Sequence, residues 1–192
     1  EQQIDIPGGV DYHATRNENR RRAKRPGQDI DRAGQNQKSG YPALGLGSNG
    51  FRGFDKASVA GSLTLRQGID GPGADTSPGS ATDLSFTRWK GTFDGVWMPT
   101  DTWRLSTSLE GDWSDNALPE AERASFGAQR FGRGYQDGEA SGDYGYGGQV
   151  ELRYLHMRKE SKWLATVQPY LLADTAHTGF NQPGYPQQTL SS

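Results

Sequence analysis

The sequence alternates between apolar and polar residues in two neighbouring segments, 86–97 and 102–113. Nearly every second residue is charged or carries a hydroxyl group, and the residues between them are mostly aromatic, aliphatic or glycine. A period of two predicts β-strands, because successive side chains of a strand point to opposite faces. The intervening MPTD, residues 98–101, predicts a tight turn, since Pro99 fixes φ at a value that turns use. The pattern therefore predicts a hairpin with one apolar face and one wet face.

These two predicted strands are long enough to cross a membrane. Trp103 and Trp113 are ten residues apart on the apolar face, which at ~3.3 Å per residue spans roughly 33 Å. Tilted by about 40°, such a strand rises roughly 25 Å, the height of the apolar band between the aromatic girdles of an outer-membrane barrel. Strands of soluble proteins usually have about five or six residues, so a soluble hairpin is the less favoured interpretation. The predicted girdle residues are Trp89, Trp97, Trp103 and Trp113.

Four further segments carry a strand pattern. In residues 57–69, Val59 and Leu63 point one way while Ser62 and Arg66 point the other. Clusters of Gly, Pro, Ser and Asp separate these segments and predict turns and loops between them. The further predicted strands are 41–46, 57–69, 146–157 and 162–176.

The chain is predicted to have three parts. Residues 1–40 are almost all polar and are predicted to form a loop or a disordered segment. Residues 41–176 hold the strands, with a long loop at 114–145, and residues 177–192 form a loop-like tail. The basic run at 17–25 could alternatively be a patch for nucleic acid or lipid headgroups. No aromatic residue interleaves with its arginines as a stacking surface requires, which favours the solvated loop.

Composition narrows the class of protein further. Hydrophobic residues make up only 32% of the chain and there are 27 glycines, which fits a partly disordered chain or a membrane barrel whose alternating strands average out as polar. No apolar run approaches the ~18 residues of a transmembrane helix. The absence of cysteine excludes disulfides and thiolate metal sites, and His13, His156 and His177 lack metal-ligand spacing. We therefore predict no metal, no cofactor and no catalytic residue, and the net charge of −2 provides no general attraction to nucleic acid.

The long loop carries the most specific motif. Residues 126–145 read FGAQRFGRGYQDGEASGDYG, and Glu151-Leu152 follows in the next predicted strand. This order resembles the loop of the hemolysin-activator type of two-partner secretion transporter, which runs phenylalanine, glycine-glycine, valine-arginine-glycine-aromatic and then serine-glycine-aspartate. The PYLLAD segment at 169–174 is similar to a late-strand motif of that family. Gly132 stands where the family prefers valine, and Ala128 replaces the second glycine.

The resemblance implies a fold and a set of site residues. It implies an outer-membrane β-barrel of about sixteen antiparallel strands when complete, of which this chain is an internal part, with the long loop folded into the lumen. In that family the motif arginine meets an aspartate on a barrel strand, so Arg133 is expected to pair with Asp174. The other expected motif residues in the lumen are Gly134, Tyr135, Ser141, Gly142 and Asp143. The expected lumen-facing residues of the wall are Arg88, Lys90, Arg104, Glu110, Glu151 and Arg153.

The function that the resemblance implies is protein export. Such a transporter moves one large unfolded partner, an adhesin or a hemolysin, across the bacterial outer membrane without ATP. Its expected partners are that secreted protein and outer-membrane lipid, with no nucleic acid. Two alternatives remain open: an outer-membrane protein assembly factor of the same superfamily, and a soluble β-rich domain that binds glycans through its tryptophans. An enzyme is not favoured, because loop carboxylates such as Glu139 and Asp143 are common without catalysis.

Overall fold

The computed structural model describes residues 2–5, 8–16, 38–71, 74–76, 82–128, 131–157 and 166–192, those before Tyr41 by their backbone alone. The regular structure of these residues is almost entirely antiparallel strand, which confirms the predicted all-β fold. The strands of the main sheet are β1 (Gln2–Asp5), β2 (Gly8–Arg16), β3 (Lys38–Gly53), β4 (Ala57–Gly68), β5 (Asp75–Thr76), β6 (Thr87–Trp97), β7 (Trp103–Trp113), β10 (Tyr144–Tyr154), β13 (Tyr170–Gly179) and β14 (Gln188–Ser191). Two small hairpins pair β8 (Ala124–Phe126) with β9 (Ala140–Gly142) and β11 (His156–Met157) with β12 (Thr166–Val167).

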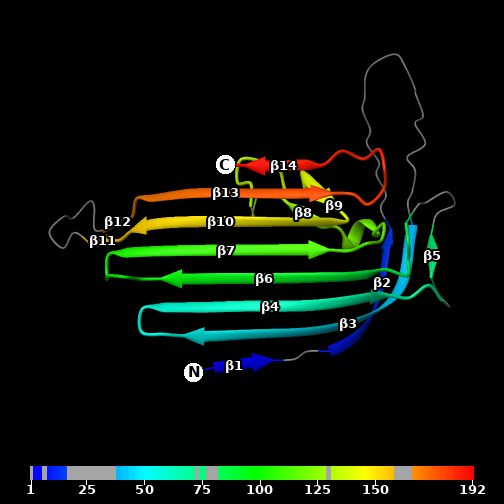
Figure 1. Ribbon diagram of the computed structural model, residues 1–192, viewed down its shortest axis with the longest axis horizontal. Coiled ribbons are helices and arrows are strands. Elements are labelled where there is room, and N and C mark those ends of the chain that lie inside the picture. The colour runs from blue at the N-terminus through cyan, green and yellow to red at the C-terminus, as the bar shows by residue number, and fades with distance from the viewer. Residues whose placement is uncertain are drawn as a thin grey trace, which may run out of the picture.

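The described strands follow one another across a single open sheet, in the order β1-β3-β4-β6-β7-β10-β13-β14, with β2 and β5 also paired to β3 (Figure 1). At one end two of the connections along this path are short turns, residues 54–56 and 98–102, and the third, 155–169, contains the hairpin β11–β12. At the other end the connections are long, at 69–86 and 114–143 (Figure 1). Short turns on one side and long loops on the other are typical of outer-membrane barrels, in which the short turns are periplasmic. Within the described ranges there is no helix with the length and apolar character needed to span a membrane.

The register of the sheet separates the side chains into two faces. Trp89 lies opposite Trp113, and Phe93 lies opposite Leu109, so the aromatic and aliphatic residues of adjacent strands fall on the same side. These four side chains are exposed. We call this the outer face. An exposed apolar surface of this extent marks contact with a membrane or with another protein.

The buried side chains lie on the opposite face, which carries Arg88 and Glu110 and which we call the inner face. The apolar ones form two clusters, and each cluster joins the main sheet, which we also call the wall, to the connection between β7 and β10. One cluster contains Tyr41, Ala43, Leu84, Phe86 and Leu118; the other contains Ala124, Phe126, Phe131 and Ala176. The core therefore lies between the sheet and its two long connections, 69–86 and 114–143.

The prediction for residues 1–40 is wrong where the structure describes them. Both β1 and β2 lie in this segment and pair with β3, and β3 itself begins at Lys38. The polar composition hid these strands, because pairing with a neighbouring strand satisfies the backbone whatever side chains it carries. The basic run at 17–25 lies outside the described residues.

Two other predicted boundaries are also wrong. The short strand predicted at 41–46 lies within β3, which has 16 residues. The prediction was too short because glycines and Asn49 obscured the continuation of the strand. The tail predicted from residue 177 contains the end of β13 and all of β14, which pairs with β13. Of the strand predicted at 162–176, residues 162–165 lie outside the described residues, and β13 begins after Pro169.

Candidate functional site

The connection between β7 and β10, residues 114–143, lies against the inner face, and we call it the inner loop. Its short 3-10 turn η1 (Glu120–Glu122) and its hairpin β8–β9 place polar and apolar side chains on the wall. The hairpin contacts β10, β13 and β14, beside which it lies in Figure 1. A loop of this length normally runs over the surface, so its contacts with the wall identify the candidate site.

Glu122 holds the first part of the inner loop. Its side chain is almost completely buried, and Oε1 accepts a hydrogen bond of 2.9 Å from the Tyr41 hydroxyl on β3. Oε1 also forms an ion pair with Arg66 Nε at 2.8 Å on β4, and Oε2 accepts a hydrogen bond of 3.2 Å from Arg88 Nη1 on β6. One carboxylate of the loop is therefore bound to three successive strands of the wall. We call Tyr41, Arg66, Arg88 and Glu122 the Glu122 cluster.

The Glu122 cluster continues across the wall as a row of ion pairs. Arg88 Nε donates to Asp112 Oδ1 at 2.9 Å on β7, and Lys90 Nζ donates to Glu110 Oε1 at 2.5 Å. Both carboxylates are buried. Buried charges are stable only when they are paired, and here three cations face three carboxylates: Arg66, Arg88 and Lys90 against Glu110, Asp112 and Glu122.

Asp143 holds the end of the inner loop. Its buried carboxylate accepts the backbone N–H of Leu118 at 2.9 Å and that of Asn181 at 3.0 Å. The Asn181 amide in turn donates to the carbonyl of Ser114 at 2.8 Å. Asp143 therefore ties both ends of the loop to the connection between β13 and β14. Gly142 allows this packing, since a Cβ there would lie 2.3 Å from the carbonyl oxygen of Gly179.

The expected ion pair between Arg133 and Asp174 is not formed. Asp174 Oδ1 instead accepts the backbone N–H of Gly132 at 2.8 Å and the Ser192 hydroxyl at 2.7 Å. Arg133 is about half exposed, and its Nη2 lies 3.9 Å from Glu151 Oε2 on β10. Asp174 therefore lies next to the motif, but it contacts the backbone N–H of Gly132 and not the side chain of Arg133.

The backbone at Gly132 explains this difference. Its φ is 89°, a left-handed value that valine, the residue preferred in the family, rarely adopts. Phe131 also has a positive φ, of 57°, and its ring packs on Gly147, where a Cβ would lie 2.5 Å from the ring. This turn directs the N–H of Gly132 at Asp174 and leaves the side chain of Arg133 beside Glu151 instead.

The remaining motif residues have different surroundings. The Tyr135 hydroxyl lies 3.4 Å from the carbonyl oxygen of Ser191, and the backbone N–H of Ser141 donates to Gln188 Oε1 at 3.1 Å. Gly134, which we expected to provide the tight turn, is exposed, and nothing lies within 4 Å of the Cβ position. It nevertheless lies inside a tight turn, because the backbone N–H of Tyr135 donates to the carbonyl of Gly132 at 3.0 Å, and the left-handed backbone of the motif lies at Gly132.

The wall residues divide between the faces as the alternation predicts. Arg88, Lys90, Glu110 and Glu151 lie on the inner face, and Arg153 pairs with Glu151 at 2.7 Å. Arg104 lies opposite Arg153 in the register and therefore shares that face. The four girdle tryptophans lie on the outer face and are exposed. It stays a prediction that the inner-face residues line a pore and that the tryptophans contact a membrane.

Of the Glu122 cluster, sequence reasoning singled out Arg88 alone, as a lumen-facing residue. Arg66 lay on the polar face of a predicted strand, which was the available signal for it. Glu122 offered no periodic signal because it lies in a loop, and Tyr41 read as an ordinary start of a strand. In the part of the chain that the structure describes, no group of three or more His, Cys, Asp or Glu residues could hold a metal ion.

Comparison with known proteins agrees with this architecture. CdiB from Escherichia coli has a similar structure, with a TM-score of 0.72 and 21% sequence identity over 99% of this chain. The chain spans 34% of the length of CdiB, so the likeness concerns part of that β-barrel fold. No curated protein matches the chain by sequence. The family model of the haemolysin secretion/activation protein ShlB/FhaC/HecB matches residues 27–192. The chain therefore belongs to the ShlB/FhaC/HecB family, whose members are outer-membrane β-barrel transporters of Gram-negative bacteria.

Proposed function

We propose that the chain supplies part of the wall and the internal plug of a pore that exports a partner protein across the outer membrane. The observation that carries this proposal is the inner loop, which is bound to the charged face of a sheet whose apolar face is exposed. Family membership supports secretion rather than glycan binding, and a pore rather than an enzyme. Passage of the partner in an unfolded form and without ATP is part of the same proposal.

The charges of the inner face suit such a passage. The carboxylates and cations of the wall are largely paired with one another, from Arg66 on β4 to Arg153 on β10. A wall whose charges are already paired offers a passing polypeptide polar surface but no strong single binding site. An unfolded chain of varied sequence can therefore move along it without being retained.

The proposal requires the inner loop to move aside during export. The second apolar cluster contains Ala124 of the loop and Ala176 of β13, and β8 contacts β13. The chain has no native cysteine. In the complete transporter, Ala124→Cys combined with Ala176→Cys can be joined by a cleavable thiol cross-linker. Secretion of the partner protein from intact cells is then measured before and after cleavage, with the two single-cysteine variants as controls.

We expect cross-linking to stop secretion in the double variant alone and cleavage to restore it. Undiminished secretion from the cross-linked double variant would mean that the loop does not block the path, and the plug would have to be abandoned. If the transporter without any substitution secretes no partner protein, the export proposal itself fails.

A further inference from the structure

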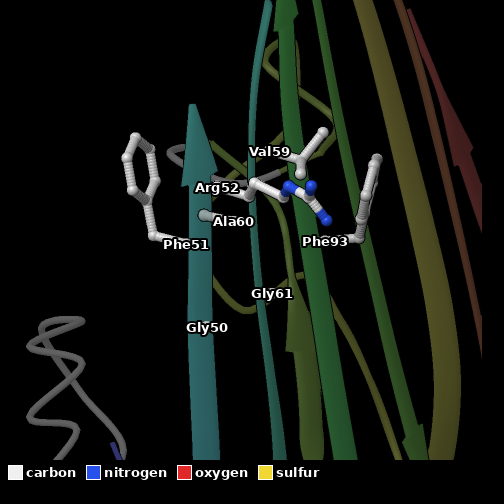
Figure 2. A pocket seen from close by; sticks show the side chains of 7 residues that line it. All are labelled: Gly50, Phe51, Arg52, Val59, Ala60, Gly61 and Phe93. Carbon is white, nitrogen blue, oxygen red and sulfur yellow. The ribbon is translucent and has the colours of Figure 1, made fainter. Parts of the chain in front are cut away.

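The outer face contains a hollow near the turn at 54–56. Its volume is about 310 Å³. Its floor is formed by Gly50 and Gly61, which lie opposite each other in the register of β3 and β4 and carry no side chains. The lining residues are Gly50, Phe51, Arg52, Val59, Ala60, Gly61 and Phe93, as Figure 2 shows.

Arg52 stands out among the residues around this hollow. Figure 2 shows its side chain extending toward the side of Phe93, whereas Phe51 points the opposite way. By register, the other outer-face positions of β3 from Leu44 onward and those of β4, β6, β7, β10, β13 and β14 are apolar or uncharged, so Arg52 is the single formal charge on this part of the outer face. Among the described side chains its guanidinium contacts the Phe54 ring, 5.2 Å from the centroid, and forms no ion pair.

A cation on a surface that faces lipid is costly unless an anion or water accepts it. Arg52 is the last residue but one of β3, and the turn at 54–56 follows it. This position is at the edge of the apolar band, where the phosphate groups of lipids lie. A guanidinium presents a planar fork of donors that matches a phosphate.

We propose that this hollow binds a phospholipid, with its phosphate on Arg52 and one acyl chain lying over Gly50 and Gly61. Phe93 and Val59 border the acyl chain, and the glycine floor lets it approach the backbone closely. The short turns belong to the periplasmic side of an outer-membrane barrel, so the ligand is a glycerophospholipid of the inner leaflet. The site rests on the proposed function only in that the sheet spans the outer membrane.

The experiment measures retained lipid by native mass spectrometry of the complete transporter, purified in mild detergent and supplied with phosphatidylglycerol. Arg52→Gln removes the cation, and Val59→Trp fills the hollow with a side chain that a membrane tolerates. Arg104→Gln is the matched control, because Arg104 is near the same end of the sheet but on the inner face. Heat-modifiable migration of each variant in gel electrophoresis verifies that the barrel is folded.

We expect Arg52→Gln to weaken phosphatidylglycerol binding by about tenfold, the effect of losing a charge-assisted hydrogen bond. Val59→Trp should lower retention while Arg52 is intact, and Arg104→Gln should leave the retention of phosphatidylglycerol unchanged. Diacylglycerol, which lacks the phosphate, should be retained equally weakly by the original protein and by Arg52→Gln.

Equal retention of phosphatidylglycerol by Arg52→Gln and the original protein would overturn the site and leave Arg52 as an arginine that only reaches toward water. Equal losses in Arg52→Gln and Arg104→Gln would overturn it as well. Secretion of the partner is measured in parallel. If secretion is absent while lipid binding is intact, the result contradicts the proposed function and leaves the lipid site standing.

Discussion

The inner loop meets the wall in two regions, the Glu122 cluster near its start and the contact of Gly132 with Asp174 in its middle. In the first region a loop carboxylate is buried among three side chains from three strands. In the second, a wall carboxylate accepts a backbone N–H, and the nearby Arg133 stays half exposed. The first region depends on charge, whereas the second depends on the conformation of the backbone.

This difference decides which substitutions should release the loop. Removing one partner of a buried set of charges leaves the others desolvated and unpaired, at a cost of several kcal/mol. An exposed ion pair is worth about 0–1 kcal/mol because water screens it. The residue that the family motif draws attention to is therefore not the one expected to hold the loop most strongly.

The largest effect is expected for Glu122→Gln. This change keeps the shape of the side chain but leaves Arg66 without the carboxylate that it faces, and should weaken the attachment of the loop by about 3 kcal/mol. Limited proteolysis of the inner loop in the folded transporter measures the release. Glu120→Gln is the control, because Glu120 lies on the same 3-10 turn and is exposed. Equal proteolysis rates in the two variants would show that the cluster does not hold the loop.

An intermediate effect is expected for Gly132→Val, although valine is the residue preferred in the family. A side chain at φ 89° costs about 1–3 kcal/mol, and a Cβ would lie 3.0 Å from Leu190 Cδ1. Proteolysis near the motif should therefore accelerate. Gly134→Val is the control, since that position has open space around it. A loop that becomes more resistant to proteolysis in Gly132→Val would contradict this prediction. It would mean that the backbone at residue 132 changes conformation and that Arg133 then pairs with Asp174.

The smallest effect on loop attachment is expected for Arg133→Ala. Its contact with Glu151 is long, at 3.9 Å, and partly exposed, so the loss should stay below about 1 kcal/mol. Glu151 keeps its closer partner Arg153. The same proteolysis assay measures how far Arg133→Ala releases the inner loop. A release as large as that of Glu122→Gln would reverse the ranking of the two regions.

A large part of the fold could be predicted from local pattern. The alternation in residues 57–69, 86–97 and 102–113 located β4, β6 and β7 to within a residue or two. It also assigned the tryptophans to one face and Arg88, Lys90 and Glu110 to the other. Period-two alternation carries this information because side chains of a strand must point to opposite faces.

The partner of the Arg-Gly-Tyr motif could not be predicted in the same way. Which atom meets Asp174 depends on the positive φ of Gly132 and on the packing of Phe131 against Gly147. The sequence contained the relevant signal, a glycine in place of valine, but its consequence for a neighbouring side chain required the backbone path. A motif therefore identified the region correctly and the contact incorrectly.

The sequence alone determined the class of fold, the two faces of the central strands and the resemblance to a family, since each depends on residue types at short, regular spacing. Tertiary structure decided the strands within residues 2–16, whose backbones are satisfied by β3, a neighbour distant in sequence. It also decided the strand at 188–191, which pairs with β13 across a loop. It also decided the Glu122 cluster, which joins residues up to 81 positions apart. A buried carboxylate must be paired, but only the folded sheet determines which side chains are within its reach.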